Sequence, residues 1–371
     1  MNFDSSTLRG EELISLRLRT LYERYGYRRF KMGQFESYGL YMENKRFLAS
    51  EQMITFTDLD GRLLALKPDV TLSIVKNART PEGGSEKLYY IENIYRPSRE
   101  SNTFREISQM GLEFIGAVEL YGLCEVVSLA LESLAAVGRK SVLELSHMGF
   151  VVGLLDALEI PEEIRGGFLS CIRSRNTHDL CALSENTGLS EEATGLLSDM
   201  TGLYGRFEEI LPRAARLVRS PAMEAALGEL AALYDALCSV GLGDNLRLGF
   251  STINDIDYYS GVIFQGFVEG LPRSVLSGGQ YDNLMRKFGR RGGAAGFAVY
   301  LSELAQLPSA ARRYDCDLLI EYTDGASLPA LMAAVRDFTA KGLRVRAEKN
   351  PLGLLYLRHY ICDENGLREV P

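Results

Sequence analysis

The sequence predicts an α+β protein built around an antiparallel sheet, and three observations lead to that prediction. Segments with strand character dominate the first part of the chain, and the few helical segments there do not follow every strand as they would in an α/β fold. The pair Asp60-Gly61 joins two short strand-like runs within residues 54–69, which is a strong signal for a hairpin. From about residue 155 to 243, Leu, Ala and Glu predominate without any strand pattern, which predicts a helical insert.

The first part of the chain alternates between one helix and several strands. An amphipathic helix is expected over residues 10–25, because Ile14, Leu18, Leu21, Tyr22 and Tyr25 fall on one stripe. Gly26 follows where such a helix would end. Period-two patterns then predict strands over 27–37, on both sides of Asp60-Gly61, over 87–96 and over 104–116.

The rest of the chain completes this domain and adds a second one. A helix over 118–138, a strand over 141–149 and the insert are followed by strands over 246–252, 258–270 and 274–279. Residues 294–307 are expected to close the domain as a helix. A strand (316–322), a helix (328–342) and two strands (344–348 and 353–359) then form a small α/β module. We therefore expect domains at 1–312 and 313–371.

Composition limits the possible functions. The chain has 371 residues and a net charge of −8, which disfavours nucleic acid as a partner. No apolar run is long enough for a membrane span, and the N-terminus lacks a signal-peptide core, so a cytoplasmic protein is expected. The six cysteines show no metal-binding spacing, and most are expected to be buried thiols. The three histidines lie far apart, so we expect no metal site and no cofactor.

The strand over 104–116 has one distinctive face. Arg105, Gln109 and Glu113 share it with Gly111, whereas Met110, Leu112 and Phe114 occupy the other. The polar face either meets water or lines a pocket that requires a carboxylate and an amide.

Other polar residues suggest what such a pocket would bind. Asp69 and Thr71 lie two residues apart on what is predicted to be one side of a strand, and together they suit an α-amino group. Tyr259 and Tyr281 would add apolar walls with polar tips. With Gln109 and Glu113, this set fits a small zwitterion with a polar ring.

Each candidate also has a structural explanation that leaves the choice open. Glu113 could be a solvated strand residue, and Asp69 could cap a helix that begins after it. Tyr258 and Tyr259 could be the core and surface positions of one strand, and Arg96 could be an ordinary surface charge.

The order of these segments resembles the catalytic core of class II aminoacyl-tRNA synthetases, in the histidyl-tRNA synthetase branch. The first helix with GYRRFKMGQFES resembles motif 1, the dimer-forming element, and YIENIYRPSRESNTFREISQMGLEFIG resembles motif 2. LKPDVT is similar to the family's Arg-Pro-Glu-x-Thr segment, and NDIDYYSGVIF and SGGQYDNL to its two histidine-specific segments. AAGFAVYLSEL resembles motif 3. The resemblance covers roughly residues 8–310 and includes a helical insert.

Departures from the family pattern concern the nucleotide half of the site. Glu303 stands where motif 3 has an arginine that stacks on adenine, and an acid there would repel phosphates. Asn254 replaces an arginine that promotes adenylate formation. Tyr300 replaces a glycine and would fill space near the nucleotide.

The amino-acid half of the site is retained. The resemblance implies that Asp69 and Thr71 hold the α-amino group of histidine and that Gln109 contacts its carboxylate side. Glu113, Tyr259 and Tyr281 would surround the imidazole. The residues expected to bind histidine are Asp69, Thr71, Arg96, Gln109, Glu113, Tyr258, Tyr259 and Tyr281.

A retained histidine pocket with a lost ATP site is similar to one paralogous family, the regulatory subunits of ATP phosphoribosyltransferase. The resemblance implies a non-catalytic protein of histidine biosynthesis that activates a short-form catalytic subunit and confers feedback inhibition by histidine. It implies a homodimeric core within a hetero-oligomer, often four plus four, and no tRNA. Two alternatives are an active or divergent histidyl-tRNA synthetase and a paralogue recruited as a sensor elsewhere.

Overall fold

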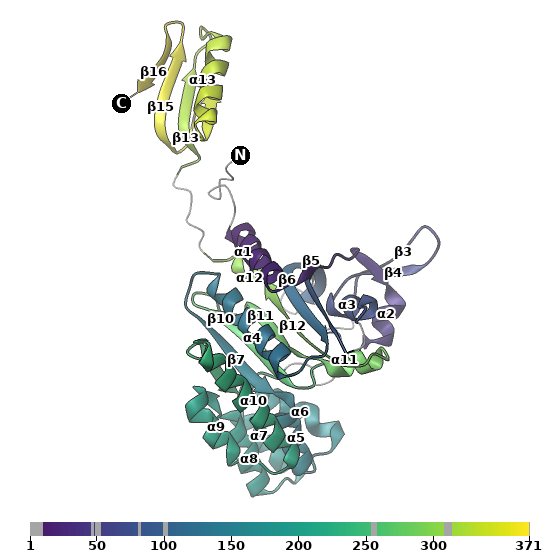
Figure 1. Ribbon diagram of the computed structural model, residues 1–371. Coiled ribbons are helices and arrows are strands. Elements are labelled where there is room, and N and C mark those ends of the chain that lie inside the picture. The colour runs from purple at the N-terminus through teal and green to yellow at the C-terminus, as the bar shows by residue number, and fades with distance from the viewer. Residues whose placement is uncertain are drawn as a thin grey trace. The chain divides into compact units, whose positions relative to one another are not determined.

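The protein consists of two compact units, Met1–Leu307 and Pro308–Pro371. A computed structural model (Figure 1) describes residues 10–45, 48, 53–80, 83–98, 103–253, 258–307 and 314–370. Within these ranges no helix is both long and apolar enough to cross a membrane.

The described part of the larger unit contains a sheet of nine strands. Neighbouring strands are antiparallel except for the pairs β1–β5 and β7–β9, so the predicted antiparallel sheet is confirmed. The strands, in spatial order, are β1 (Arg28–Arg29), β5 (Ser85–Ser98), β6 (Thr103–Gly116), β12 (Gly293–Tyr300), β11 (Leu276–Gln280), β10 (Val262–Val268), β7 (Ser141–His147), β9 (Leu246–Gly249) and β8 (Tyr204–Gly205).

A smaller sheet beside it contains the predicted hairpin. β3 (Thr55–Thr57) and β4 (Leu63–Leu66) pair antiparallel, and β2 (Phe35–Ser37) pairs with the other edge of β4. Gly61 has a φ of 78°, a left-handed backbone that favours glycine. The prediction from Asp60-Gly61 is therefore confirmed.

Helices cover both faces of the nine-stranded sheet. α1 (Gly10–Arg24) and α4 (Leu120–Ala135) pack in one core cluster with Met110, Leu112 and Phe114 of β6. α3 (Thr71–Asn77) and α11 (Asp282–Lys287) belong to a second cluster, which contains Tyr90 of β5 and Ile115 of β6. The alternation along β6 therefore directs Glu113 and its neighbours toward the α3 and α11 side. The remaining helices outside the insert are α2 (Tyr38–Glu43), α5 (Met148–Ala157) and α12 (Leu301–Leu304).

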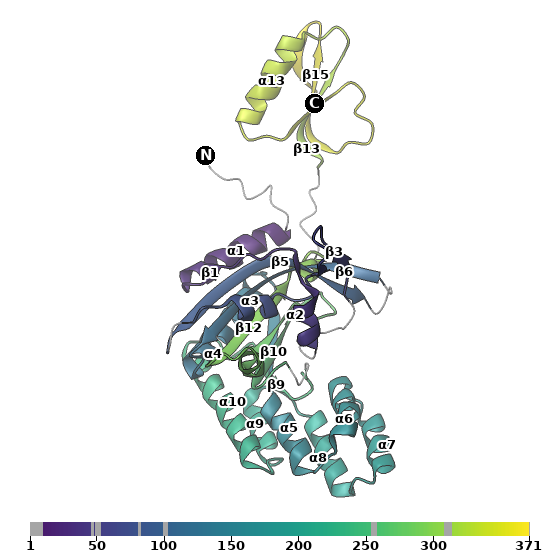
Figure 2. The ribbon, with the colours of Figure 1, turned by 90° about the vertical axis from the view of Figure 1, so that its right-hand side faces the viewer.

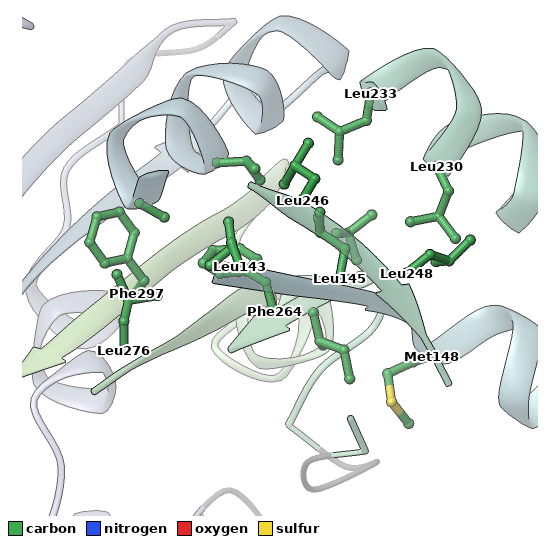
Figure 3. Packing of buried hydrophobic residues seen from close by; sticks show 14 of the residues in the cluster. Leu143, Leu145, Met148, Leu230, Leu233, Leu246, Leu248, Phe264, Leu276 and Phe297 are labelled. Atoms are coloured by element: carbon green, nitrogen blue, oxygen red, sulfur yellow. The ribbon is translucent and has the colours of Figure 1, made fainter. Parts of the chain in front are cut away.

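The helical insert lies beyond β9 (Figure 2). Its helices are α6 (Glu162–Ser174), α7 (Thr177–Thr187), α8 (Glu191–Thr201), α9 (Phe207–Ala215) and α10 (Pro221–Ser239). Leu230 and Leu233 of α10 point toward leucines of β7 and β9, and all of these side chains are buried (Figure 3). Burial of leucine against leucine fixes the insert to the sheet.

Several sequence predictions about this unit are wrong. Residues 294–307 do not form one helix, because 293–300 is strand β12, paired along its whole length with β6. Glycines weaken a helix there, and tertiary pairing overrides the helix preference of the alanines. The single strand expected over 27–37 is divided between β1 and β2, which join different sheets. The insert also contains one short strand, β8.

The expectation that most cysteines are buried is also wrong. The side chains on the outer surfaces of insert helices remain accessible, and all six thiols are free. Cys316 and Cys362 are buried, Cys124 and Cys171 are half-buried, and Cys181 and Cys238 are exposed.

The smaller unit has its own core. Its described residues form a sheet of order β14-β13-β15-β16, in which β13 is parallel to both neighbours and β15–β16 is an antiparallel hairpin. Leu331 of α13 packs against Leu318 and Ile320 of β13. The final strand β16 was not predicted. The elements are β13 (Cys316–Tyr322), α13 (Leu328–Ala340), β14 (Val345–Glu348), β15 (Tyr356–Asp363) and β16 (Gly366–Val370).

The absence of a side chain at Gly296 of β12 is a requirement of the sheet. A Cβ atom there would lie 1.8 Å from Oε2 of Glu113 and 2.4 Å from the carbonyl oxygen of Leu112. We expect Gly296→Ala to lower the free energy of unfolding by about 1–3 kcal/mol, because the added methyl group cannot be accommodated unless Glu113 and the backbone of Leu112 shift. Chemical denaturation measures this difference.

A matched control is Gly228→Ala in α10, where an added Cβ meets no atom within 4 Å. That substitution should raise the free energy of unfolding by about 0.5–1 kcal/mol, since alanine is the better helix former. A Gly296→Ala protein as stable as the wild type would contradict the close packing of β12 on β6.

Candidate functional site

All eight residues singled out from the sequence line one cavity of about 220 Å³, here called the polar cavity. They come from the start of α3, from β5 and β6, from the chain before β10 and from the residue before α11. They are Asp69, Thr71, Arg96, Gln109, Glu113, Tyr258, Tyr259 and Tyr281. The polar face of β6 therefore meets a pocket at Gln109 and Glu113, whereas Arg105 is exposed.

Sequence reasoning did not assign six further lining residues to the pocket, although it did expect Tyr300 to fill space. They lie on β5, β11 and β12, whose neighbours in the sheet could not be deduced from local patterns. They are Tyr90, Ser277, Gly296, Phe297, Ala298 and Tyr300.

Glycines make room for the polar groups of the cavity. Gly296 leaves space for the carboxyl group of Glu113, as its missing Cβ would overlap Oε2. At Gly111 of β6, a Cβ would lie 2.5 Å from the hydroxyl oxygen of Tyr90. Strand positions without side chains thus create a concave polar surface on an otherwise filled sheet face.

Glu113 is the more deeply buried of the two carboxyl residues that line the polar cavity. The residue is 2% exposed, against 8% for Asp69, and its Oε1 accepts a hydrogen bond of 2.7 Å from the hydroxyl of Thr71. The hydroxyl of Tyr281 donates to Oε2. Burial raises the pKa of Glu113 to about 8, although both hydrogen bonds oppose this by favouring the carboxylate. The negative charge of Asp69 raises this pKa further.

Asp69 lies in the chain before α3, not in a strand as predicted. Oδ1 accepts a hydrogen bond of 2.8 Å from the amide of Leu72, so the helix-capping alternative is confirmed. The other oxygen faces Arg96, with Nη2 at 3.5 Å from Oδ2. Burial raises the pKa of Asp69, and the Arg96 charge partly counteracts this. Asp69 therefore both caps the N-terminal end of α3 and presents a carboxyl oxygen to the cavity.

Arg96 is held in place by backbone as well as by charge. Its Nε donates to the carbonyl oxygen of Pro68 at 2.8 Å. That bond orients the guanidinium on the segment that carries Asp69. The sequence-based alternative of an unconstrained surface charge is therefore wrong.

Three tyrosines form one wall. The ring of Tyr258 lies 4.6 Å from that of Tyr259 and 5.7 Å from that of Tyr281, both tilted. Burial raises the pKa of all three hydroxyls above the usual value near 10. The wall is therefore neutral at physiological pH and presents ring faces and hydroxyl groups.

A pair of hydroxyls also lines the polar cavity. Tyr300 pairs in register with Gln109 of β6, and its hydroxyl lies 2.6 Å from that of Ser277. Both residues line the cavity. Tyr300 therefore contributes its ring and hydroxyl to the lining, and its effect on a nucleotide stays a prediction.

Of the two other predicted departures, the structure describes one. Glu303 of α12 is not among the residues that line the cavity, and its Oε2 accepts a hydrogen bond of 2.8 Å from Gln306. Asn254 lies outside the described residues.

The combined chemistry suits recognition of a small zwitterion. Two carboxyl groups and one guanidinium can meet opposite charges, and an amide and several hydroxyls can hydrogen-bond to a polar ring. Within the described ranges, no group of three or more His, Cys, Asp or Glu side chains is placed to hold a metal ion.

Comparison with known proteins gives consistent matches. A family model described as histidyl-tRNA synthetase matches residues 3–304. An ATP phosphoribosyltransferase regulatory subunit from Moorella thermoacetica is 30% identical over 338 residues, which is 90% of this chain and 86% of that protein.

Two solved structures show the same fold at lower identity. One is an ATP phosphoribosyltransferase regulatory subunit/histidyl-tRNA synthetase from Bacillus halodurans, with a TM-score of 0.75 and 22% identity over 95% of this chain and 94% of that one. The other is a chain of the ATP phosphoribosyl transferase (HisG:HisZ) complex from Thermotoga maritima, with a TM-score of 0.61 and 18% identity over 78% and 97%. The predicted synthetase-like fold is therefore confirmed.

The raised pKa of Glu113 predicts a pH-dependent stability. Between about pH 4.5, its ordinary value, and pH 8, the folded protein holds a proton that the unfolded chain has lost. Stability of the wild type should therefore fall as pH rises through this range, relative to Glu113→Gln, by on the order of a few kcal/mol. Denaturation of both proteins from pH 4.5 to 9 measures it.

Glu303→Gln, outside the cavity, is the control and should follow the wild type. Parallel stability curves for the wild type and Glu113→Gln would mean that Glu113 ionises normally in the folded protein.

Proposed function

This chain belongs to the family of ATP phosphoribosyltransferase regulatory subunits, which carries a histidyl-tRNA synthetase domain, and on that premise we propose that its polar cavity binds histidine. The observation that carries the proposal is the convergence of Glu113, Asp69 and Arg96 with a tyrosine wall in one small cavity. By this proposal, bound histidine regulates a separate catalytic subunit.

Each part of histidine has a matching group in the proposed complex. The α-ammonium group meets Asp69 and the hydroxyl oxygen of Thr71, which keeps acceptor capacity while its proton is donated to Glu113. The carboxylate meets Arg96 and the amide of Gln109. The imidazole lies against the tyrosine wall, with one ring nitrogen directed at Glu113.

Binding without catalysis is the second part of the proposal. Amino-acid activation needs room for a nucleotide and cations for its phosphates. Tyr300 and Ser277 line the cavity, and outside it position 303 carries an acid where the family pattern has an arginine. We therefore propose that the chain forms no histidyl adenylate. The alternative, an active histidyl-tRNA synthetase, finds its support in the same fold and the retained amino-acid groups.

The partner proposed is the short-form catalytic subunit of ATP phosphoribosyltransferase. A regulatory subunit acts by favouring one state of its partner, and histidine inhibits only if it binds one state of the complex better than the other. A homodimer of this chain within a larger hetero-oligomer is the assembly proposed from the resemblance.

The direct test is formation of phosphoribosyl-ATP by the catalytic subunit from the same organism. We expect the rate to increase when this chain is added, and to fall again when histidine is added. Spectrophotometric assay of the product measures both effects. The reverse result, no activation together with histidine-dependent ATP–pyrophosphate exchange by this chain alone, would establish the synthetase alternative.

Histidine affinity tests the cavity itself. Glu113→Ala removes the buried carboxyl group beside the proposed imidazole and leaves one ring nitrogen without its hydrogen-bond partner, a loss of about 1.5–3 kcal/mol. We expect the dissociation constant measured by calorimetry to rise about 10- to 150-fold. Glu303→Ala, outside the cavity, should leave it unchanged, and unchanged affinity in Glu113→Ala would place histidine elsewhere.

A further inference from the structure

Four consecutive residues that follow β9, here called the anchored segment (Phe250–Ile253), are each held by a different contact. Phe250 is fully buried and stacks on Phe150 of α5, with ring centroids 4.3 Å apart. The hydroxyl of Thr252 donates to Oε1 of Glu144 in β7 at 2.7 Å. The first contact is made by helix α5 and the second by strand β7 of the large sheet.

The other two contacts come from the helical insert. Nε of Arg175 donates to the hydroxyl of Ser251 at 2.7 Å, and Nε of Arg173 donates to the carbonyl oxygen of Ile253 at 2.9 Å. Both arginines lie at the C-terminal end of α6. Arg173 is in the last turn of the helix, and Arg175 is its C-cap residue. The insert therefore fixes the anchored segment at its second and fourth residues.

The backbone at Arg175 is unusual. It has a φ of 53°, in the left-handed region where helix C-caps usually carry glycine. An arginine is less favourable than glycine in this backbone conformation, but its side chain makes contacts that glycine cannot make. Its guanidinium also lies over the ring of Tyr204 at 4.4 Å and 3.4 Å from Oε1 of Glu144. Such an outlier is a reason to look for a functional constraint.

The anchored segment precedes the tyrosine wall of the polar cavity in the sequence, and the four residues between them lie outside the described ranges. Tyr258 and Tyr259 follow Ile253 by five and six residues. Beyond them, the amide of Ser260 donates to the carbonyl oxygen of Gln280 at 2.9 Å, and its hydroxyl accepts from the amide of Asp282 at 3.0 Å. The two tyrosines thus lie between one fixed point held by the insert and another held by β11 and α11.

Contacts on both sides of Tyr258 and Tyr259 in the sequence reduce the conformations that these two residues can adopt. A ligand that packs on a wall already ordered loses less entropy on binding than one that must order it. The contacts of α6 therefore bear on ligand affinity although neither arginine lines the cavity.

We propose that Arg173 and Arg175 are positioning residues through which the helical insert holds Tyr258 and Tyr259 ready for ligand. This rests on the proposed function for the identity of the ligand, histidine, but not for the ordering of the wall. Because coupling is reciprocal, ligand in the polar cavity also stabilises the end of α6. The insert is then the element that senses occupancy of the cavity.

The test uses Arg175→Gly, which removes the guanidinium while suiting the left-handed backbone. Its matched control is Glu159→Gly, because Glu159 is exposed just after α5 and has a similar φ of 52°. We expect Arg175→Gly to raise the dissociation constant for histidine about three- to tenfold, the effect of losing an ordinary hydrogen bond. The control should keep wild-type affinity, and thermal unfolding should show that both variants are folded at the temperature of the binding measurement, although Arg175→Gly loses the contacts of Arg175 with Ser251, Tyr204 and Glu144.

Hydrogen exchange separates this inference from the proposed function. In the ligand-free full chain, peptides that cover residues 250–262 should exchange faster in Arg175→Gly and in Arg173→Ala than in the wild type or Glu159→Gly. Added histidine should slow exchange at the end of α6 in the wild type and not in Arg175→Gly.

The outcomes differ for the two proposals. A wild type that fails to bind histidine would overturn the proposed function, while faster exchange in both arginine variants would still support the positioning role. Unchanged exchange in both variants would overturn that role. So would faster exchange with unchanged histidine affinity, since the ordering would then have no effect on binding.

Discussion

The carboxyl group of Glu113, enclosed between the hydroxyls of Thr71 and Tyr281, is the interaction on which the site depends. It joins the start of α3, strand β6 and the residue before α11, and it requires Gly296 on β12. A buried carboxyl group is unfavourable unless its oxygens find donors. The hydroxyls of Thr71 and Tyr281 supply these donors. The carboxyl group is therefore hydrogen-bonded only when α3, β6 and the residue before α11, which are distant in sequence, are arranged as they are here.

That constraint also explains why the cavity remains polar within a sheet face that is otherwise apolar. Tyr90 and Tyr281 both belong to the apolar cluster on this face, yet their hydroxyls point to the cavity region beside Gly111 and Glu113. Aromatic rings can fill a core and still present one polar atom. The same side chains therefore stabilise the fold and prepare a surface for a small polar ligand.

Local patterns predicted the parts of this protein that local forces determine. The period-two alternation of β6, the Asp60-Gly61 hairpin and the long helices follow from residue spacing. What could not be deduced is the order of strands. β12 lies between β6 and β11, and this pairing makes a strand of an alanine-rich segment whose local preference led to the wrong prediction of a helix. Ser277, Gly296 and Tyr300 were therefore not assigned to the pocket as binding groups. Asp69 was placed there for a reason only half right, since it also caps α3.

A site that loses its chemistry need not lose its binding energy. Groups that hold an amino acid act in the ground state, whereas those that stabilise charge on a nucleotide act in the transition state, and the two sets are separable. By the proposed function, the first set converges on Glu113 and Asp69, while Tyr300 lines the cavity beside Gln109. Retained affinity for a small molecule is useful to a regulator only if it changes the stability of another element. The contacts of α6 with Ser251 and Ile253 supply the connection proposed for this chain, because they join the segment that precedes Tyr258 to a helical insert packed in the same apolar cluster as the sheet.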